Sequence, residues 1–214
     1  MALLKHDSKS IRTDLNWDFS SGTVTGIPSG SLVLIKTLTA SASSSLSFVN
    51  GSNDVVLDST YKAYKFVFKN IHSSNSTVNF TFQGSTNGGS SYGVTITSTI
   101  FTAYHGENDV SSGLVYVSDA DLAQSTSYQP LSRNLQTAND DSVNGEIWLY
   151  NPSSTTYVKH FTVASVNSPD QNANMTNEFS AGYFNTTSAI DAIDFKMSSG
   201  NIDAGTISLY GLTT

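Results

Sequence analysis

The chain has 214 residues, of which 13% are charged and 11% aromatic, and its formal net charge is −7. This length suits one large all-β domain, and the absence of cysteine excludes disulfides, Cys-ligated zinc and iron–sulfur clusters. The negative charge, with no cluster of Lys or Arg, argues against a role on nucleic acid, because phosphate backbones are bound through grouped cations.

The first residues carry no targeting signal. Residues 1–9 lack the apolar core of a secretory signal, so we expect a protein made in a cytoplasm and not exported by the general route. No apolar run approaches the roughly 20 residues that a membrane-spanning helix needs, so we expect no membrane insertion.

Residues 1–30 are predicted to form an N-terminal arm without regular structure, since they show no sustained helical or strand period. Large aromatic side chains in such a polar segment need apolar surface to cover them. Two interpretations stay open. In one, Trp17, Phe19, Ile27 and Pro28 dock on a neighbouring protein; in the other, the two aromatic side chains pack on their own domain.

From Leu32 onward apolar and polar residues alternate, which is the signature of half-buried strands. Tyr64, Phe66 and Phe68, for example, alternate with two lysines, so their rings are predicted to face the core. A helical turn is favoured only over residues 118–124. The other alternating runs lie at residues 32–35, 46–48, 78–82, 94–100, 115–117, 147–149, 158–163, 193–197 and 207–209.

Turn-forming clusters of Asn, Gly, Pro and Ser separate these runs, as at residues 50–53, 87–90 and 151–153. Roughly nine to eleven short strands separated by such turns predict an all-β fold. We expect a single β-sandwich over residues 31–214, jelly-roll-like in its topology.

Patterns of catalytic and metal-binding residues are sparse. No two histidines have the spacing of a metalloprotease helix, and no nucleophile elbow is present. His105 lies near Glu107 and Asp109, and a polar loop is the simpler interpretation. The acidic pairs at 119–121 and 140–141 lack a full calcium-loop pattern. We predict no catalytic residue, no metal site and no cofactor, and an ion bound between subunits stays an open alternative.

Several segments carry a family resemblance: NPSSTTYVKHF at 151–161, AGYFNTTSA at 181–189, FKMSSGNIDAGTISLYG at 195–211, and the stretches 34–41 and 61–68. Together they resemble virion structural proteins of marine tailed bacteriophages, often labelled tail fibre or structural protein. The likeness spans about residues 30 to 214. It leaves out the arm and brings no catalytic residues.

The resemblance implies a non-enzymatic protein on the virion surface, made in the host cytoplasm, as a capsid decoration, an appendage or a tail-fibre component. Its expected partners are a major capsid or tail protein, bound through the arm, and further copies of itself. We expect a homo-oligomer, with a trimer favoured because jelly-roll virion proteins usually assemble around symmetry axes.

Two other functions are weighed against this one. A glycan-binding module would stack sugars on tyrosines near loops, and Tyr92, Tyr104, Tyr116 and Tyr128 are the candidates. The simpler interpretation makes each of them a strand residue with its hydroxyl at the surface. The other function is that of a depolymerase of host polysaccharide. Such an enzyme needs two converging carboxylates, which the sequence does not identify.

Overall fold

The computed structural model describes residues 31–168 and 173–213. The predicted arm, with Trp17, Phe19, Ile27 and Pro28, lies outside the described residues.

The described residues form twelve strands and no helix. All neighbouring strands in both sheets are antiparallel. That part of the chain holds no helix long and apolar enough to cross a membrane. The strands are β1 (Leu32–Thr39), β2 (Leu46–Val49), β3 (Ala63–Ser73), β4 (Val78–Ser85), β5 (Ile96–Gly106), β6 (Ser112–Tyr116), β7 (Gln129–Leu135), β8 (Ser142–Tyr150), β9 (Lys159–Ser168), β10 (Asn174–Phe184), β11 (Ala192–Met197) and β12 (Ile202–Leu212).

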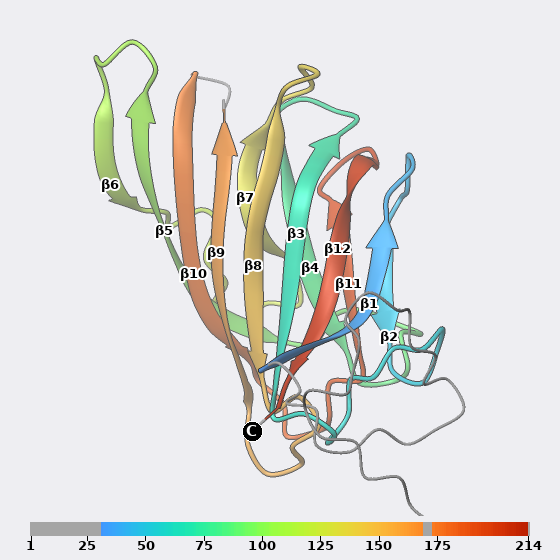
Figure 1. Ribbon diagram of the computed structural model, residues 1–214. Helices are drawn as coiled ribbons and strands as arrows, with labels where there is room; N and C mark the ends of the chain where they lie inside the picture. The colour runs from blue at the N-terminus through green and yellow to red at the C-terminus, as the bar shows by residue number, and fades with distance from the viewer. Residues whose placement is uncertain (1–30, 169–172, 214) are drawn as a thin grey trace, which may run out of the picture.

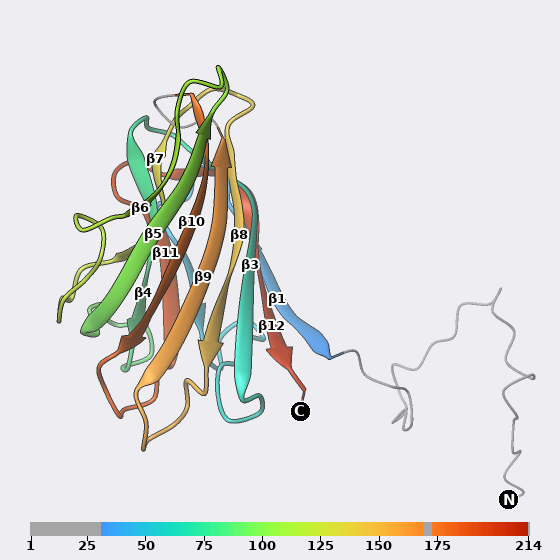
Figure 2. The same ribbon diagram turned by 90° about the vertical axis from the view of Figure 1, so that its left-hand side faces the viewer.

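The strands form two layers, a large sheet and a small sheet (Figures 1 and 2). The large sheet has eight strands in the order β1-β12-β3-β8-β9-β10-β5-β6, and the small sheet has four in the order β2-β11-β4-β7. We call the face of the large sheet that is turned toward the small sheet its inner face, and the opposite face its outer face.

Eight of the twelve strands make a jelly roll. We number these eight strands first to eighth in chain order: β1, β2, β3, β4, β7, β8, β11 and β12. In these numbers, the order of strands across the small sheet is second, seventh, fourth, fifth. The half of the large sheet formed by β1-β12-β3-β8 has the order first, eighth, third, sixth. Together the two orders are those of a jelly roll of two antiparallel sheets. The prediction of an all-β, jelly-roll-like sandwich is therefore confirmed.

The other four strands enlarge the large sheet beyond β8. The β5–β6 hairpin is inserted between β4 and β7, and the β9–β10 hairpin is inserted between β8 and β11. They lie side by side in the order β9-β10-β5-β6, and we call them the extension. Figure 1 shows its last two strands beyond β7, where the small sheet has ended.

The core lies between the two sheets and is rich in phenylalanine. Phe66 of β3 packs against Phe195 of β11 with ring centroids 5.4 Å apart, and Phe68 packs against Phe80 of β4 at the same distance. Tyr64, Phe66 and Phe68 are at most 1% exposed, so the core face predicted from their alternation is confirmed. Each such buried side chain stabilises the fold by about 1.5–3 kcal/mol.

Twelve strands are one more than the expected range of nine to eleven, and two of them, β7 and β10, had no apolar alternation to mark them. Both strands bury polar side chains, and β7 is hydrogen-bonded by polar side chains of β9. On β9, Ser165 Oγ donates to the carbonyl of Leu131 at 2.6 Å, and Asn167 Nδ2 donates to the carbonyl of Arg133 at 3.1 Å. Where the extension faces β7, its inner face is polar and supplies hydrogen bonds to this edge strand of the small sheet.

Candidate functional site

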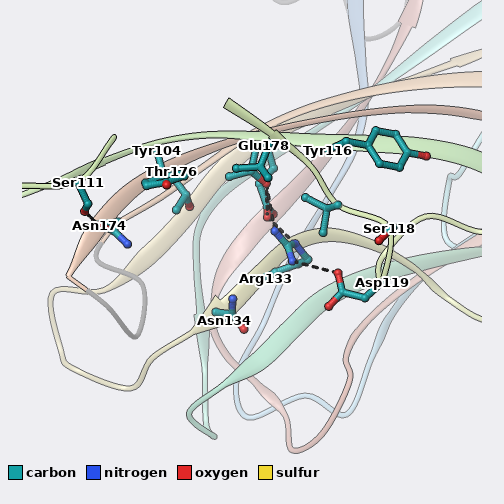
Figure 3. A pocket seen from close by; sticks show the side chains of 13 residues that line it. Tyr104, Ser111, Tyr116, Ser118, Asp119, Arg133, Asn134, Asn174, Thr176 and Glu178 are labelled. Atoms are coloured by element: carbon teal, nitrogen blue, oxygen red, sulfur yellow. Dashed lines mark hydrogen bonds and ion pairs between the residues drawn. The ribbon is translucent and has the colours of Figure 1, made fainter. Parts of the chain in front are cut away.

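A groove of about 570 Å³ lies on the inner face of the extension. It forms where β10 and β5 run past β7, so that the small sheet no longer covers them (Figure 3). Strand β6 and the turn that follows it, at residues 117–119, supply the opposite wall. Residues from four strands and from the two connections on either side of β6 therefore meet at this place.

The floor of the groove holds an ion pair between the two sheets. Arg133 Nε of β7 donates to Glu178 Oε1 of β10 at 2.7 Å (Figure 3). Thr102 of β5 connects the two, because its hydroxyl accepts from Arg133 Nη2 at 3.1 Å and donates to Glu178 Oε1 at 3.2 Å. Asp119, exposed on the turn, lies 3.8 Å from Arg133 Nη1.

Glu178 is only 3% exposed, and its second carboxylate oxygen, Oε2, has no hydrogen-bond partner among the described residues. Burial raises the pKa of this carboxyl, and the charge and hydrogen bonds of Arg133 oppose the shift without cancelling it. Buried polar atoms are nearly always hydrogen-bonded in folded proteins. Oε2 exposes less than 1 Å² of surface, so it is an unsatisfied acceptor just beneath the groove, and a donor reaches it only when the side chain shifts.

The rim of the groove carries an aromatic ring and several amides and hydroxyls. Tyr104 of β5 pairs with Gly113 of β6, and a Cβ at that glycine would lie only 3.0 Å from the tyrosine ring. The missing side chain therefore gives the ring its room. Ser111 Oγ donates to Asn174 Oδ1 at 3.2 Å, and Asn134 of β7 lies across the groove from this pair (Figure 3).

The four predicted tyrosines are not brought together at one site. Tyr104 lines the groove. Tyr116 only borders it, because its ring points away from Arg133 and Glu178 (Figure 3), and its hydroxyl donates to the carboxylate of Asp121. Tyr92 lines a separate depression of about 360 Å³, and Tyr128 lies near it.

Tyr128 is held at the small sheet by two charged neighbours. Its hydroxyl donates to Asp194 Oδ2 at 3.0 Å, and Lys196 Nζ lies 3.9 Å from the centre of its ring. Burial, followed by the charge of Asp194, raises the pKa of the Tyr128 hydroxyl. These bonds fit the simpler interpretation, in which the residue belongs to the structure of its sheet.

The other candidate clusters form local contacts. His105 belongs to the end of β5, and its Nε2 lies 3.2 Å from Oδ1 of Asp109 in the exposed turn that follows, so the predicted polar loop begins only after the strand. Asp121 accepts from Tyr116, and Asp141 accepts from the amide of Ala138 at 3.2 Å. Within residues 31–168 and 173–213, no group of three or more His, Cys, Asp or Glu could hold a metal ion.

Sequence reasoning missed the charged centre of the groove. Arg133 and Glu178 are 45 positions apart and belong to no motif, so nothing local relates them. The one available signal was a polar alternation along β10, in which every second side chain from Asn174 to Ser180 is buried. Comparison of the chain with protein-family models, with curated proteins and with solved structures gives no match.

Proposed function

We propose that this chain is a non-enzymatic structural protein of a bacteriophage particle, displayed on its surface as a capsid decoration, an appendage or a tail-fibre component. Three features support the proposal. The resemblance to virion proteins covers most of the chain, the sequence is rich in uncharged polar residues, and jelly rolls are common in viral capsid domains. A fold alone does not fix a function, so the assembly surface carries the argument.

The observation that carries this proposal is the outer face of the extension. Phe101 of β5 and Phe179 of β10 stack there with ring centroids 5.2 Å apart. Tyr116 pairs with Phe101 across the sheet, and Leu114 and Met175 lie on the same face. Leu114 is 72% exposed, Tyr116 54%, Met175 44% and Phe101 41%. Grouped apolar side chains of this kind mark protein–protein contact surfaces.

Strand β6 adds an unprotected sheet edge to this face. The other three edges carry recognised protection: β1 has a bulge between Leu34 and Lys36, β2 has only four residues, and β7 contains Pro130. Strand β6 has the sequence Ser-Gly-Leu-Val-Tyr, with no charge and no proline, and all five residues are exposed. In our proposal this edge pairs with another virion protein or with a further copy of the chain, within a homo-oligomer.

The arm supplies a second contact in this proposal. Trp17, Phe19, Ile27 and Pro28 would dock on a major capsid or tail protein, in an interface of about 1,600 Å². The described chain enters the domain at β1, and β1 and β6 are the two outermost strands of the large sheet. The two contacts would then lie at opposite edges, one for attachment and one for self-association.

Cryo-electron microscopy of intact particles tests the proposal by fitting the domain into head and tail density. Density on the capsid lattice makes the chain a decoration protein, and density only at the tail makes it a fibre component. Particles that carry Trp17→Ala should show lower occupancy while the domain stays folded. Absence of the chain from purified particles overturns the proposal, and unchanged occupancy of the variant overturns the docking role of the arm.

A second candidate function is the recognition of a glycan on the host surface, and the groove is the observation that favours it. Receptor-binding proteins are themselves virion components, so the two candidates are compatible. A glycan array probed with the purified chain tests it, and the absence of binding to any host polysaccharide removes it.

A polysaccharide depolymerase, the third alternative, finds less support in the groove. Its two carboxylates, Asp119 and Glu178, both contact the guanidinium of Arg133. Glycosidases instead hold two carboxyls on either side of the bond that they cleave. Release of reducing ends from host polysaccharide by the purified chain would reinstate this alternative.

A further inference from the structure

We infer that the groove of the extension binds an uncharged, hydroxyl-rich saccharide, with its hydroxyls bonded to Glu178 and Asn134 and one ring lying against Tyr104. This inference rests on the second candidate function, glycan recognition, and names the site and the class of sugar.

The carboxylate of Glu178 supplies the first reason. Its Oε1 is already occupied by Arg133 and Thr102, whereas Oε2 has no partner among the described residues. A neutral sugar hydroxyl is a suitable donor to such an oxygen once the side chain shifts to expose it, because hydrogen bonds to charged groups are stronger than those between neutral groups. The ion pair keeps the carboxylate at the floor of the groove, which limits the ordering needed on binding.

The rest of the lining matches a sugar in the same way. Asn134 offers both a donor and an acceptor in its amide, which suits a hydroxyl that does both. Tyr104, Val115 and Val117 supply apolar surface for the C–H face of a sugar ring. A cavity of about 570 Å³ is within the roughly 300–1,000 Å³ of small-ligand sites, which combine apolar walls with a few placed polar groups.

Charge decides between neutral and acidic sugars. Arg133 is the one cation among the described residues that line the groove, and both Glu178 and Asp119 already contact it. The chain also carries a net charge of −7. A uronic acid or a sulfated sugar would therefore meet repulsion without a free cation to offset it, whereas a neutral sugar would not.

The test is a glycan array and isothermal titration with the purified full chain, using neutral oligosaccharides and matched oligosaccharides that contain uronic acid or sulfate. We expect binding to members of the neutral set. Tyr104→Ala should weaken that binding at least tenfold, because the ring surface is lost. Tyr150→Ala is the matched control, since this tyrosine is 41% exposed on the outer face of the large sheet, and it should bind as the wild type does.

A second variant tests the same site in case Tyr104→Ala fails to fold. Ser111→Trp places a bulky group at an exposed position on the rim, so it should block the groove without disturbing the core. Binding of acidic oligosaccharides alone overturns this inference and leaves glycan recognition standing. Neutral binding that survives both Tyr104→Ala and Ser111→Trp places the sugar elsewhere and also overturns it. No binding to either set overturns both the inference and glycan recognition.

Discussion

Arg133 on the edge strand of the small sheet lies 2.7 Å, Nε to Oε1, from Glu178 on the inner face of the extension. This ion pair links an inserted hairpin to the jelly roll, and it also forms the floor of the groove. Its loss is therefore expected to affect the stability of the domain as well as any ligand held there.

Arg133→Ala should lower the free energy of unfolding by about 3–5 kcal/mol at neutral pH, because it leaves a buried carboxylate without its counter-charge. Urea denaturation followed by circular dichroism measures this loss. The double variant Arg133→Met with Glu178→Leu is the control, and it should recover much of the loss because no buried charge remains. A cost below about 1 kcal/mol for the single variant would contradict the role assigned to the pair.

The pH dependence of stability should report on Glu178 directly. Burial raises the folded pKa of this carboxyl above the ordinary value of 4.5. The folded state therefore holds the proton more tightly than the unfolded state. Its contribution to stability is full below the unfolded pKa and is lost as the pH rises through the folded pKa.

Glu178→Gln cannot ionise at this position, so it is the reference for that measurement. The difference in unfolding free energy between wild type and variant should shift in favour of the variant as the pH rises from 4 to 7. Denaturation at matched pH values measures the difference. A difference that stays constant, or that moves toward the wild type, would show that the folded pKa is not raised.

Gly145→Ala should destabilise the junction between the jelly roll and the extension by about 1–3 kcal/mol. A Cβ at Gly145 of β8 would meet the carbonyl oxygen of Ala164 on β9 and lie 2.7 Å from the ring of Phe68. Gly93→Ala is the control, because its nearest heavy atom would be 3.9 Å away, at Thr126. Thermal unfolding of the two variants should differ by several degrees, and equal melting temperatures would refute this packing argument.

Leu114→Lys should weaken self-association of the chain. A lysine on the open edge strand β6 places a charge where a further strand would pair, which is how natural sheet edges avoid pairing. Size-exclusion chromatography with light scattering should show a smaller species than the wild type at equal concentration. Tyr157→Lys, in the exposed loop between β8 and β9, should leave the assembly unchanged. A wild type that stays monomeric at all concentrations would disprove self-association through β6.

Local alternation predicted the core of the sandwich. Tyr64, Phe66 and Phe68 alternate with lysines, and this pattern by itself determined which face of β3 is buried. The same kind of apolar alternation gave a wrong prediction for the edge strand β6. Val115 belongs to an apolar run that predicted a half-buried strand, yet it is 47% exposed because β6 has a neighbour on one side only.

The groove needed the tertiary structure. Arg133 and Glu178 lie on strands that no apolar alternation marked, and they meet because the β5–β6 and β9–β10 hairpins both join the large sheet beyond β8. Periodicity reports only on neighbours along the chain, and it determined the all-β class and the sandwich core. The order of strands depends on pairing between distant segments, and that order alone decided where the polar faces converge.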